Sequence, residues 1–351
     1  MKFLKSILSL PFHLVALLTG SNSFIANPII GSRLLNYCGL HILRYCLAHF
    51  LTQCRWSFLL WKMPASDRKA FHKDGFLVLQ NYLSEDEFNA LVIETTAIEG
   101  EARELSQGDT HTQRILLDHE SLEKSPALKK FISNRSFNNL LDYGASFAHP
   151  ALLYLQRIRN GLYGQTTHSS DPQKNIHSDT FHPTMKAWYF LEDVAPEDGP
   201  FTYVAGSHQF TWKRLKWEYK KSITVQNHPD GYSEKGSMRA DIEDLREMDL
   251  PNPQALPLPA NSLVIANTHG FHCRGQAVAG RGRFEIWAYC RMNPFIPLPK
   301  IMARWGGRYQ RRVMRWYWSY LDKKNEKRGV PSTWHLIDHK LVTNKEYDAK
   351  K

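Results

Sequence analysis

The feature that most constrains the fold is a series of short apolar segments in the middle of the chain, each bounded by turn-forming residues. The segments span residues 152–158, 187–191, 201–204, 263–266 and 284–289. Short runs rich in aromatic and β-branched residues, separated by clusters of Gly, Pro and Asp such as 196–200 and 279–282, are typical of β-strands. Several such strands in succession predict a barrel or a double-sheet jelly roll.

Helical patterns surround this series. Residues 66–98 are expected to form a helix end, a turn at Asp74-Gly75, a strand over 76–79 and a second helix, and residues 121–145 one or two further helices. Residues 218–260 are polar and read as an insertion or lid between strands. The predicted fold is therefore mainly β with flanking α-helices, with a double-stranded β-helix (jelly-roll, cupin-like) core.

The charge of the chain divides it into three parts. The whole chain has 45 Lys and Arg and 34 Asp and Glu, a net charge of +11. Residues 1–65 contain six basic and no acidic residues, residues 300–351 have a net charge of +9, and residues 66–299 have −4. A nucleic-acid binder usually carries its positive charge on the folded domain, so this division argues against one. It favours basic ends that meet an anionic surface. We expect a body over 66–299, an apolar basic N-terminal helical segment over 1–65 and a basic aromatic C-terminal helix and tail over 300–351.

The two ends leave alternatives open. Residues 2–18 partly resemble a secretory signal. Between residues 34 and 61, five polar residues fall within an arc of roughly 140° on a helix, and most of the remaining surface is apolar. This helix could pack on the body, lie on a membrane surface or, least in keeping with its charges, span the membrane. The helix predicted over 300–322 could lie at a membrane interface or dock on the barrel. The polar arc is formed by His41, Arg44, His49, Thr52 and Arg55.

The number and spacing of the cysteines indicate the redox environment in which the protein works. The five cysteines form no close pairs, so they indicate neither a disulfide framework nor a zinc site. The chain is expected to be reduced and cytoplasmic, with peripheral membrane contact as a further expectation from its basic ends.

One pattern in the body carries chemistry. His177 and Asp179 are two residues apart, so both side chains can point to one side of a strand. His269 and His272 follow the apolar segment 263–266. Two imidazoles and one carboxylate on one face of Fe(II) leave three positions open, which can take a bidentate 2-oxo acid and O2. A nearby arginine could hold the far carboxylate of 2-oxoglutarate through a bidentate pair.

These motifs, taken with their neighbours, resemble the phytanoyl-CoA dioxygenase family of Fe(II)- and 2-oxoglutarate-dependent oxygenases. The resemblance covers about 66–295. Its motifs appear in order as the segment 71–79 followed by the helix 84–91, then His177-x-Asp179, Ala187-Trp188, the stretches 191–194, 197–200 and 206–208, and finally the segment 267–272. Ala205 stands where the family usually has Pro, and Cys273-Arg274 where small residues are common.

The resemblance implies a set of site residues. His177, Asp179 and His272 would bind iron, and Arg283 would anchor 2-oxoglutarate, because the family's distal histidine stands about eleven residues before its arginine. Arg281 is the alternative anchor. Trp188 and Gln156 would face the co-substrate. His208 is expected to be structural, and His182 either to line the pocket or to be exposed.

The implied activity is a 2-oxoglutarate-dependent dioxygenase that uses Fe(II), 2-oxoglutarate and O2. Because Asp179 is present where a halogenase would have a small residue, hydroxylation of an aliphatic carbon is expected. The substrate would be a small molecule or lipid-like. The alternatives are a hydroxylase of protein residues and a non-catalytic barrel that binds a lipid or a membrane protein.

Overall fold

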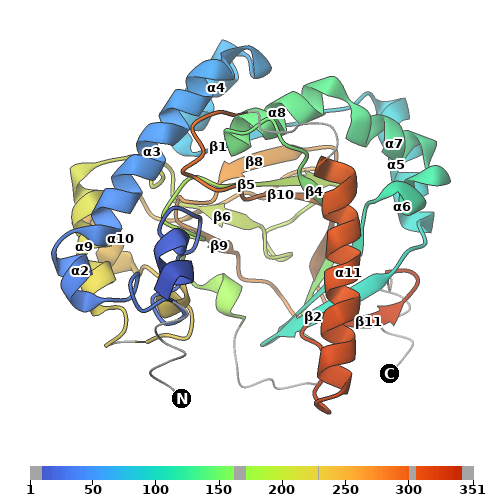
Figure 1. The fold of residues 1–351 in the computed structure, drawn as a ribbon. Coiled ribbons are helices and arrows are strands. Elements are labelled where there is room, and N and C mark those ends of the chain that lie inside the picture. Colours follow the sequence, from blue (N-terminus) through green and yellow to red (C-terminus); the bar gives the residue numbers. More distant parts are fainter. Residues whose placement is uncertain (1–9, 162–170, 228, 300–305, 342–351) are drawn as a thin grey trace.

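The fold is built on two antiparallel sheets that face each other (Figure 1). The computed structural model describes residues 10–161, 171–227, 229–299 and 306–341. The large sheet has the strand order β1-β8-β5-β10-β4-β3-β2-β11, and the small sheet the order β7-β6-β9. The strands are β1 (Phe76–Leu79), β2 (Ala102–Gln107), β3 (Thr110–Leu116), β4 (Leu152–Asn160), β5 (Met185–Phe190), β6 (Phe201–Tyr203), β7 (Gln254–Ala255), β8 (Leu263–Asn267), β9 (His272–Arg274), β10 (Gly282–Cys290) and β11 (His335–Asp338).

The predicted fold class is confirmed: strands form a jelly-roll core and helices flank it. Each of the five apolar segments between 152 and 289 is a strand, as is the segment 76–79. The hairpin of β2 and β3 and the edge strand β11 were not predicted. The helices are α2 (Arg33–Tyr37), α3 (Leu40–Phe58), α4 (Ala65–Asp74), α5 (Glu85–Ala97), α6 (His119–Glu123), α7 (Pro126–Ser133), α8 (Arg135–Ala145), α9 (Trp212–Thr224), α10 (Ile242–Glu247) and α11 (Gly306–Glu326), with short 3-10 turns at Leu60–Lys62, Pro172–Lys174 and Ser233–Lys235.

The two faces of the large sheet have different surroundings. One face carries Leu155, Ile265 and Ile286, which pack against buried side chains of α4, α5, α7 and α8 such as Phe71 and Leu140. The other face points toward the small sheet, and its aromatic side chains form a second core cluster with those of β6. A binding site is therefore expected between the two sheets.

The N-terminal helix α3 packs on the body through its polar side. All five residues of the polar arc are buried. Arg55, which is fully buried, donates hydrogen bonds to Ser146 Oγ and to the carbonyl groups of Pro294 and Ile296 at 3.1, 2.9 and 2.7 Å. The apolar side of α3 faces outward instead. None of the helices in the described ranges is long and apolar enough to cross a membrane.

The C-terminal helix α11 docks on the body, which is one of the two alternatives for it. Arg315 Nε lies 2.5 Å from Asp118 Oδ2, Arg103 Nη2 lies 2.6 Å from Asp322 Oδ2, and Trp318 is buried in the second core cluster. Residues 300–305, the first part of the predicted helix, lie outside the described residues. Residues 218–260 form the end of α9, α10 and β7, and Met238 and Leu245 lie in a third buried cluster, so this stretch is a packed layer rather than an open lid.

Candidate metal centre

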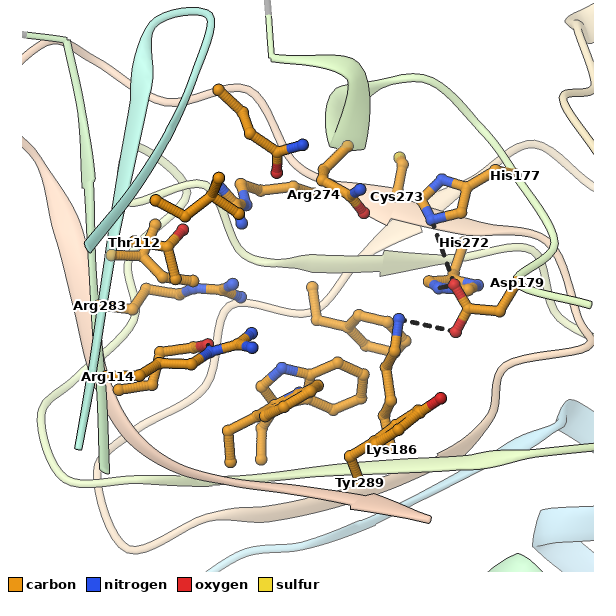
Figure 2. A pocket seen from close by; sticks show the side chains of 18 of the residues that line it. Thr112, Arg114, His177, Asp179, Lys186, His272, Cys273, Arg274, Arg283 and Tyr289 are labelled. Carbon is orange, nitrogen blue, oxygen red and sulfur yellow. Dashed lines mark hydrogen bonds and ion pairs between the residues drawn. The ribbon is translucent and has the colours of Figure 1, made fainter. Parts of the chain in front are cut away.

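Two histidines and one aspartate meet at the end of the small sheet. Asp179 Oδ1 lies 3.7 Å from His177 Nε2 and 3.6 Å from His272 Nε2 (Figure 2). The three ligand atoms lie within 4.8 Å of one another, and among the described residues this is the one such group. Because metal–ligand bonds of about 2.0–2.2 Å allow two ligands of one ion to lie up to about 4.2 Å apart, both carboxylate–imidazole distances are compatible with one bound ion.

Both imidazoles are oriented for a ligand at Nε2. His177 Nδ1 donates to the carbonyl of Asn175 at 2.7 Å, and His272 Nδ1 donates to the carbonyl of Gly270 at 2.9 Å. A proton on Nδ1 leaves the Nε2 lone pair available, as in metal-binding histidines generally. His272 Nε2 is buried and has no hydrogen-bond partner among the described residues. A buried acceptor in this state is suited to bind a cation.

The charge states of the three side chains also suit a metal. Burial lowers the pKa of His177 well below its usual value and that of His272 to about 4, so both rings are neutral at physiological pH. Burial opposes ionisation of Asp179, but Lys186 and the two imidazoles outweigh it and hold the pKa of the carboxyl below its usual range. Lys186 Nζ lies 2.7 Å from Asp179 Oδ2, which leaves Oδ1 as the oxygen that faces both histidines.

Backbone pairing holds the ligands in register. His177 and His272 form an isolated antiparallel bridge, with each backbone N–H 2.9 Å from the carbonyl of the other. The turn before His272 needs a glycine, because a Cβ at Gly270 would lie 1.8 Å from the hydroxyl of Tyr203. That hydroxyl donates to the carbonyl of Asn267 at 2.8 Å. The segment 267–272 thus brings His272 next to His177 and Asp179, which lie about ninety residues earlier in the sequence.

A cavity of about 430 Å³ adjoins the triad, on the inner face of the large sheet. Arg283, Trp188 and Gln156 line it, so the structure brings all six predicted site residues to one place. Arg283 is 4% exposed, its Nη1 has no hydrogen-bond partner among the described residues, and its Nε lies 3.6 Å from Glu285 Oε2. A buried guanidinium with a free N–H group suits the carboxylate of a co-substrate.

The other arginine considered as an anchor lies outside the cavity. The side chain of Arg281 is 53% exposed, and its Nε is 2.9 Å from Asp198 Oδ1. The geometry therefore favours Arg283 over Arg281 as the anchor.

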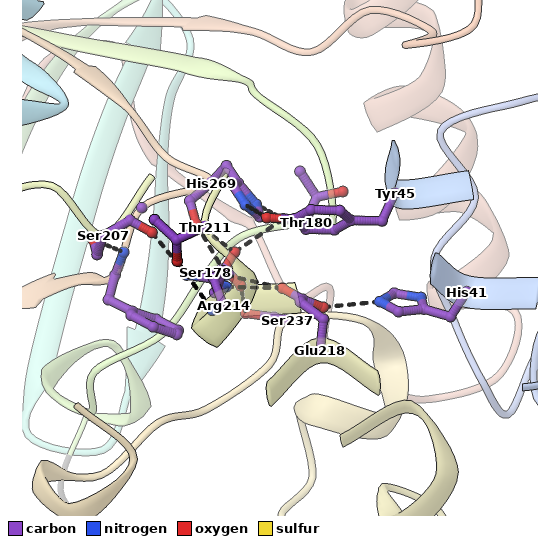
Figure 3. Close-up of polar contacts among 12 residues, drawn as sticks. His41, Tyr45, Ser178, Thr180, Ser207, Thr211, Arg214, Glu218, Ser237 and His269 are labelled. Atoms are coloured by element: carbon purple, nitrogen blue, oxygen red, sulfur yellow. Dashed lines mark hydrogen bonds and ion pairs between the residues drawn. The ribbon is translucent and has the colours of Figure 1, made fainter. Parts of the chain in front are cut away.

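Three other histidines that the sequence singles out, His269, His208 and His182, are buried away from the triad. His269 is held by two contacts, from Nδ1 to the carbonyl of Thr180 at 2.9 Å and between Nε2 and Tyr45 Oη at 3.0 Å, so neither nitrogen is free for a metal (Figure 3). His208 is buried against Gly75. His182 was expected in the pocket or at the surface, and both expectations are wrong. It is 1% exposed and is not among the residues that line the cavity.

Four further cationic residues line the cavity and were not predicted as site residues: Arg114, Lys186, Arg274 and Arg291. Arg114 comes from β3, whose polar sequence concealed the strand, although the turn at Gly108-Asp109 signals a hairpin. Lys186 precedes Trp188 by two residues on β5, so the alternation of a strand would have placed it on the same face. Arg274 follows His272 by two residues on β9 in the same way.

A triad of two buried histidines and one partly buried aspartate inside a jelly roll defines the class of the non-haem iron oxygenases. The chain belongs to the phytanoyl-CoA dioxygenase family, since the model of that family matches residues 71–247. This is a family of Fe(II)- and 2-oxoglutarate-dependent enzymes. The match includes His177 and Asp179 and ends before His272 and Arg283, whose assignment rests on the geometry.

Comparison with solved structures finds distant similarities, each to part of this chain. The epimerase SnoN of nogalamycin biosynthesis is 15% identical over 64% of this chain and 80% of its own, with a TM-score of 0.39. The carbocyclase SnoK of the same biosynthesis is 18% identical over 65% and 83%, with a TM-score of 0.41. HygX from Streptomyces hygroscopicus, solved with nickel and 2-oxoglutarate, is 16% identical over 65% and 86%, with a TM-score of 0.38. The search of curated proteins finds no significant match.

Proposed function

We propose that this protein hydroxylates an aliphatic carbon of a small-molecule or lipid-like substrate, with Fe(II) held by His177, Asp179 and His272 and with 2-oxoglutarate anchored by Arg283. The observation that carries the proposal is the joint position of the triad and the buried guanidinium on one cavity. When bound, the iron and 2-oxoglutarate would activate O2, which is the oxidant and takes two electrons from 2-oxoglutarate and two from the substrate. The chain supplies geometry and surroundings.

Each site residue has a separate task in this proposal. His177, Asp179 and His272 would hold the ion at the wall of the cavity. Lys186 contacts the second oxygen of Asp179, so the carboxylate would offer its other oxygen to the ion. Trp188 and Phe201, whose ring centroids lie 4.2 Å apart, form an apolar wall that excludes water beside the triad.

Gln156 positions other groups rather than binding the co-substrate through its own amide. Its Oε1 accepts a hydrogen bond from Arg114 Nε at 2.6 Å, and its Nε2 donates to Glu285. Both polar ends are thus engaged, and the side chain fixes Arg114, which lines the cavity, relative to the buried Glu285.

The size of the cavity favours a small substrate, or one end of a long one, over a folded protein loop. About 430 Å³ must hold 2-oxoglutarate and the reacting part of the substrate together. A hydroxylase of protein residues remains the second candidate from the sequence, and the structure adds no observation in its favour.

The proposal is tested by loading the full chain anaerobically with Fe(II) and then measuring succinate released from 2-oxoglutarate under O2. We expect about one iron per chain and slow succinate release, which rises when a lipid extract or a metabolite extract contains the substrate. A chain that binds no stoichiometric iron, or that binds iron and never releases succinate with any extract, would instead be the non-catalytic barrel.

A further inference from the structure

The cavity contains more positive charge than iron and 2-oxoglutarate require. Five cationic side chains line it, namely Arg114, Lys186, Arg274, Arg283 and Arg291. Three of them contact carboxylates: Lys186 contacts Asp179, Arg274 contacts Asp171 at 2.8 Å, and Arg283 contacts Glu285. The charges of a divalent ion and of the 2-oxoglutarate dianion cancel. Arg114 and Arg291 remain, and no carboxylate of the described residues lies within ion-pair distance of either.

Arg114 is the more deeply placed of the two. Figure 2 shows its guanidinium beside that of Arg283, with both groups directed toward the triad. The guanidinium carbon of Arg114 lies 3.9 Å from the ring centroid of Trp287 and 4.8 Å from that of Trp334. Its Nε is engaged by Gln156. Burial lowers the pKa of Arg114 to about 10, which still leaves the group cationic at physiological pH.

A guanidinium held in this way is preorganised to bind an anion. The indole rings and the bond to Gln156 fix its plane, so little conformational entropy is lost when the two terminal nitrogens bind a carboxylate or a phosphate. Arg291 is exposed at the rim of the cavity, where one nitrogen donates to the carbonyl of Gly20 at 3.2 Å. The positive potential thus extends from the floor of the cavity to its mouth.

We infer that the substrate carries an anionic group, a carboxylate or a phosphate, that binds Arg114. This inference rests on the proposed function, because it assigns Arg283 to 2-oxoglutarate and leaves Arg114 for the substrate. The anion would hold the substrate between the arginine and the open face of the metal site, with the reacting carbon toward the triad.

The test uses protein loaded with Mn(II) and N-oxalylglycine, so that the metal and co-substrate positions are filled. Isothermal titration calorimetry then compares hexanoate, hexyl phosphate and hexanol. Both anions, or one of them, should bind at least about tenfold more tightly than hexanol, and the stronger anion identifies the head group. Arg114→Gln should weaken the anion at least about tenfold, Arg114→Lys less, and the control Arg281→Gln not at all.

Several outcomes separate this inference from the proposed function. Equal binding of hexanol and the anions, or anion binding that Arg114→Gln leaves unchanged, overturns the inference. If Arg114→Gln instead abolishes the binding of 2-oxoglutarate to the Mn(II) protein, Arg114 is the co-substrate anchor and the inference is also overturned. If the unaltered Mn(II) protein does not bind 2-oxoglutarate, the proposed function itself fails.

A second inference comes from the outward side of the N-terminal helices. On α3, Leu43, Leu47 and Phe50 are 68%, 40% and 64% exposed, while the polar side of the same helix is buried. Of the 27 large hydrophobic residues exposed in the described ranges, 15 belong to residues 10–61. We call these fifteen the N-terminal apolar surface: Leu10, Phe12, Leu14, Val15, Leu18, Ile25, Leu34, Leu35, Tyr37, Leu43, Leu47, Phe50, Phe58, Leu60 and Trp61.

This surface has the chemistry of a membrane-binding face. Residues 1–65 contain no Asp or Glu, so nothing in the segment repels an anionic lipid headgroup. Arg44 and Arg55 face the body, and Arg33 is the exposed basic residue in the described part of the segment. Exposed apolar residues concentrated on one segment mark an interaction site. The neighbouring Phe210 and Trp212 are also exposed, and the ring of Phe210 lies 5.7 Å from that of Tyr45 on α3. We propose that the N-terminal apolar surface lies on a bilayer that contains anionic lipids.

Vesicle flotation of the full chain tests this proposal. We expect binding to vesicles of phosphatidylcholine and phosphatidylglycerol, weaker binding to phosphatidylcholine alone, and a loss of at least about tenfold in the variant Leu43→Gln/Leu47→Gln/Phe50→Gln. The matched control is Ile93→Gln/Leu336→Gln, which changes exposed apolar residues elsewhere. No flotation of the unaltered chain overturns the proposal, as does equal flotation of the triple variant. A dimer that the triple variant dissociates, without flotation, would assign the surface to a second copy.

Discussion

Replacing Asp179 by alanine is expected to reduce iron-dependent succinate release at least about a hundredfold, since even residues that only orient metal ligands contribute 10–100-fold to affinity or activity. The substitution removes the one carboxylate between the two imidazoles and leaves Lys186 as an unpaired cation beside the metal position. Both changes disfavour a divalent ion. Iron content after anaerobic loading should fall in parallel with turnover, and His177→Ala should behave in the same way.

A matched control is provided by a second partly buried carboxylate that pairs with a lysine. Asp142 Oδ2 lies 2.6 Å from Lys62 Nζ, in a part of the molecule remote from the triad. Asp142→Ala should lower stability and leave the iron content per folded chain unchanged. Unchanged turnover in purified Asp179→Ala protein would contradict the assignment of the metal centre.

Replacing Arg283 by glutamine is expected to raise the KM for 2-oxoglutarate at least about thirtyfold, the equivalent of about 2 kcal/mol, with a smaller change in kcat. The guanidinium is buried, and its Nη1 has no hydrogen-bond partner in the part of the chain that the structure describes. A bound carboxylate would satisfy this N–H group, whose burial without a partner is costly. Initial rates of succinate release as a function of 2-oxoglutarate concentration measure the effect.

The neighbouring arginine is the natural control. Arg281→Gln removes an exposed contact with Asp198. The KM of this variant for 2-oxoglutarate should therefore stay within about threefold of that of the unaltered protein. If Arg281→Gln raises the KM and Arg283→Gln does not, the anchor has been assigned to the wrong residue.

The fold was predictable where hydrophobic and turn residues alternate clearly. The apolar strands between β4 and β10 show this pattern of short hydrophobic runs bounded by turn residues. The hairpin of β2 and β3 does not show it. One side of β3 lines a cationic cavity, so Thr112 and Arg114 stand where a core strand would have apolar residues. A polar strand beside a charged site therefore has no hydrophobic signature, and the residue of greatest interest for the substrate was missed with it.

The site was predictable as far as the motifs extended. The family resemblance implied His177, Asp179, His272 and Arg283 as site residues, and the structure places them around one cavity. The fate of the other histidines depended on tertiary contacts. His182 is enclosed by neighbours that only the folded chain brings together. The polar arc of α3 was open to several interpretations for the same reason, because its partners lie far away in the sequence.

Because the polar side of α3 packs on the body, a fragment designed for expression should include α3. The family match begins at residue 71, yet His41 Nε2 lies 2.8 Å from Glu218 Oε2, and Glu218 in turn binds Arg214, whose Nη1 donates to the carbonyl of Ser207 (Figure 3). A fragment cut at the family boundary would open this ionic network to water on one side and would deprive His269 of its contact with Tyr45. The region that matches the family is thus shorter than the part of the chain that packs together. Point substitutions on the outward side of α3 can therefore test the proposed membrane contact without the loss of stability that truncation would cause.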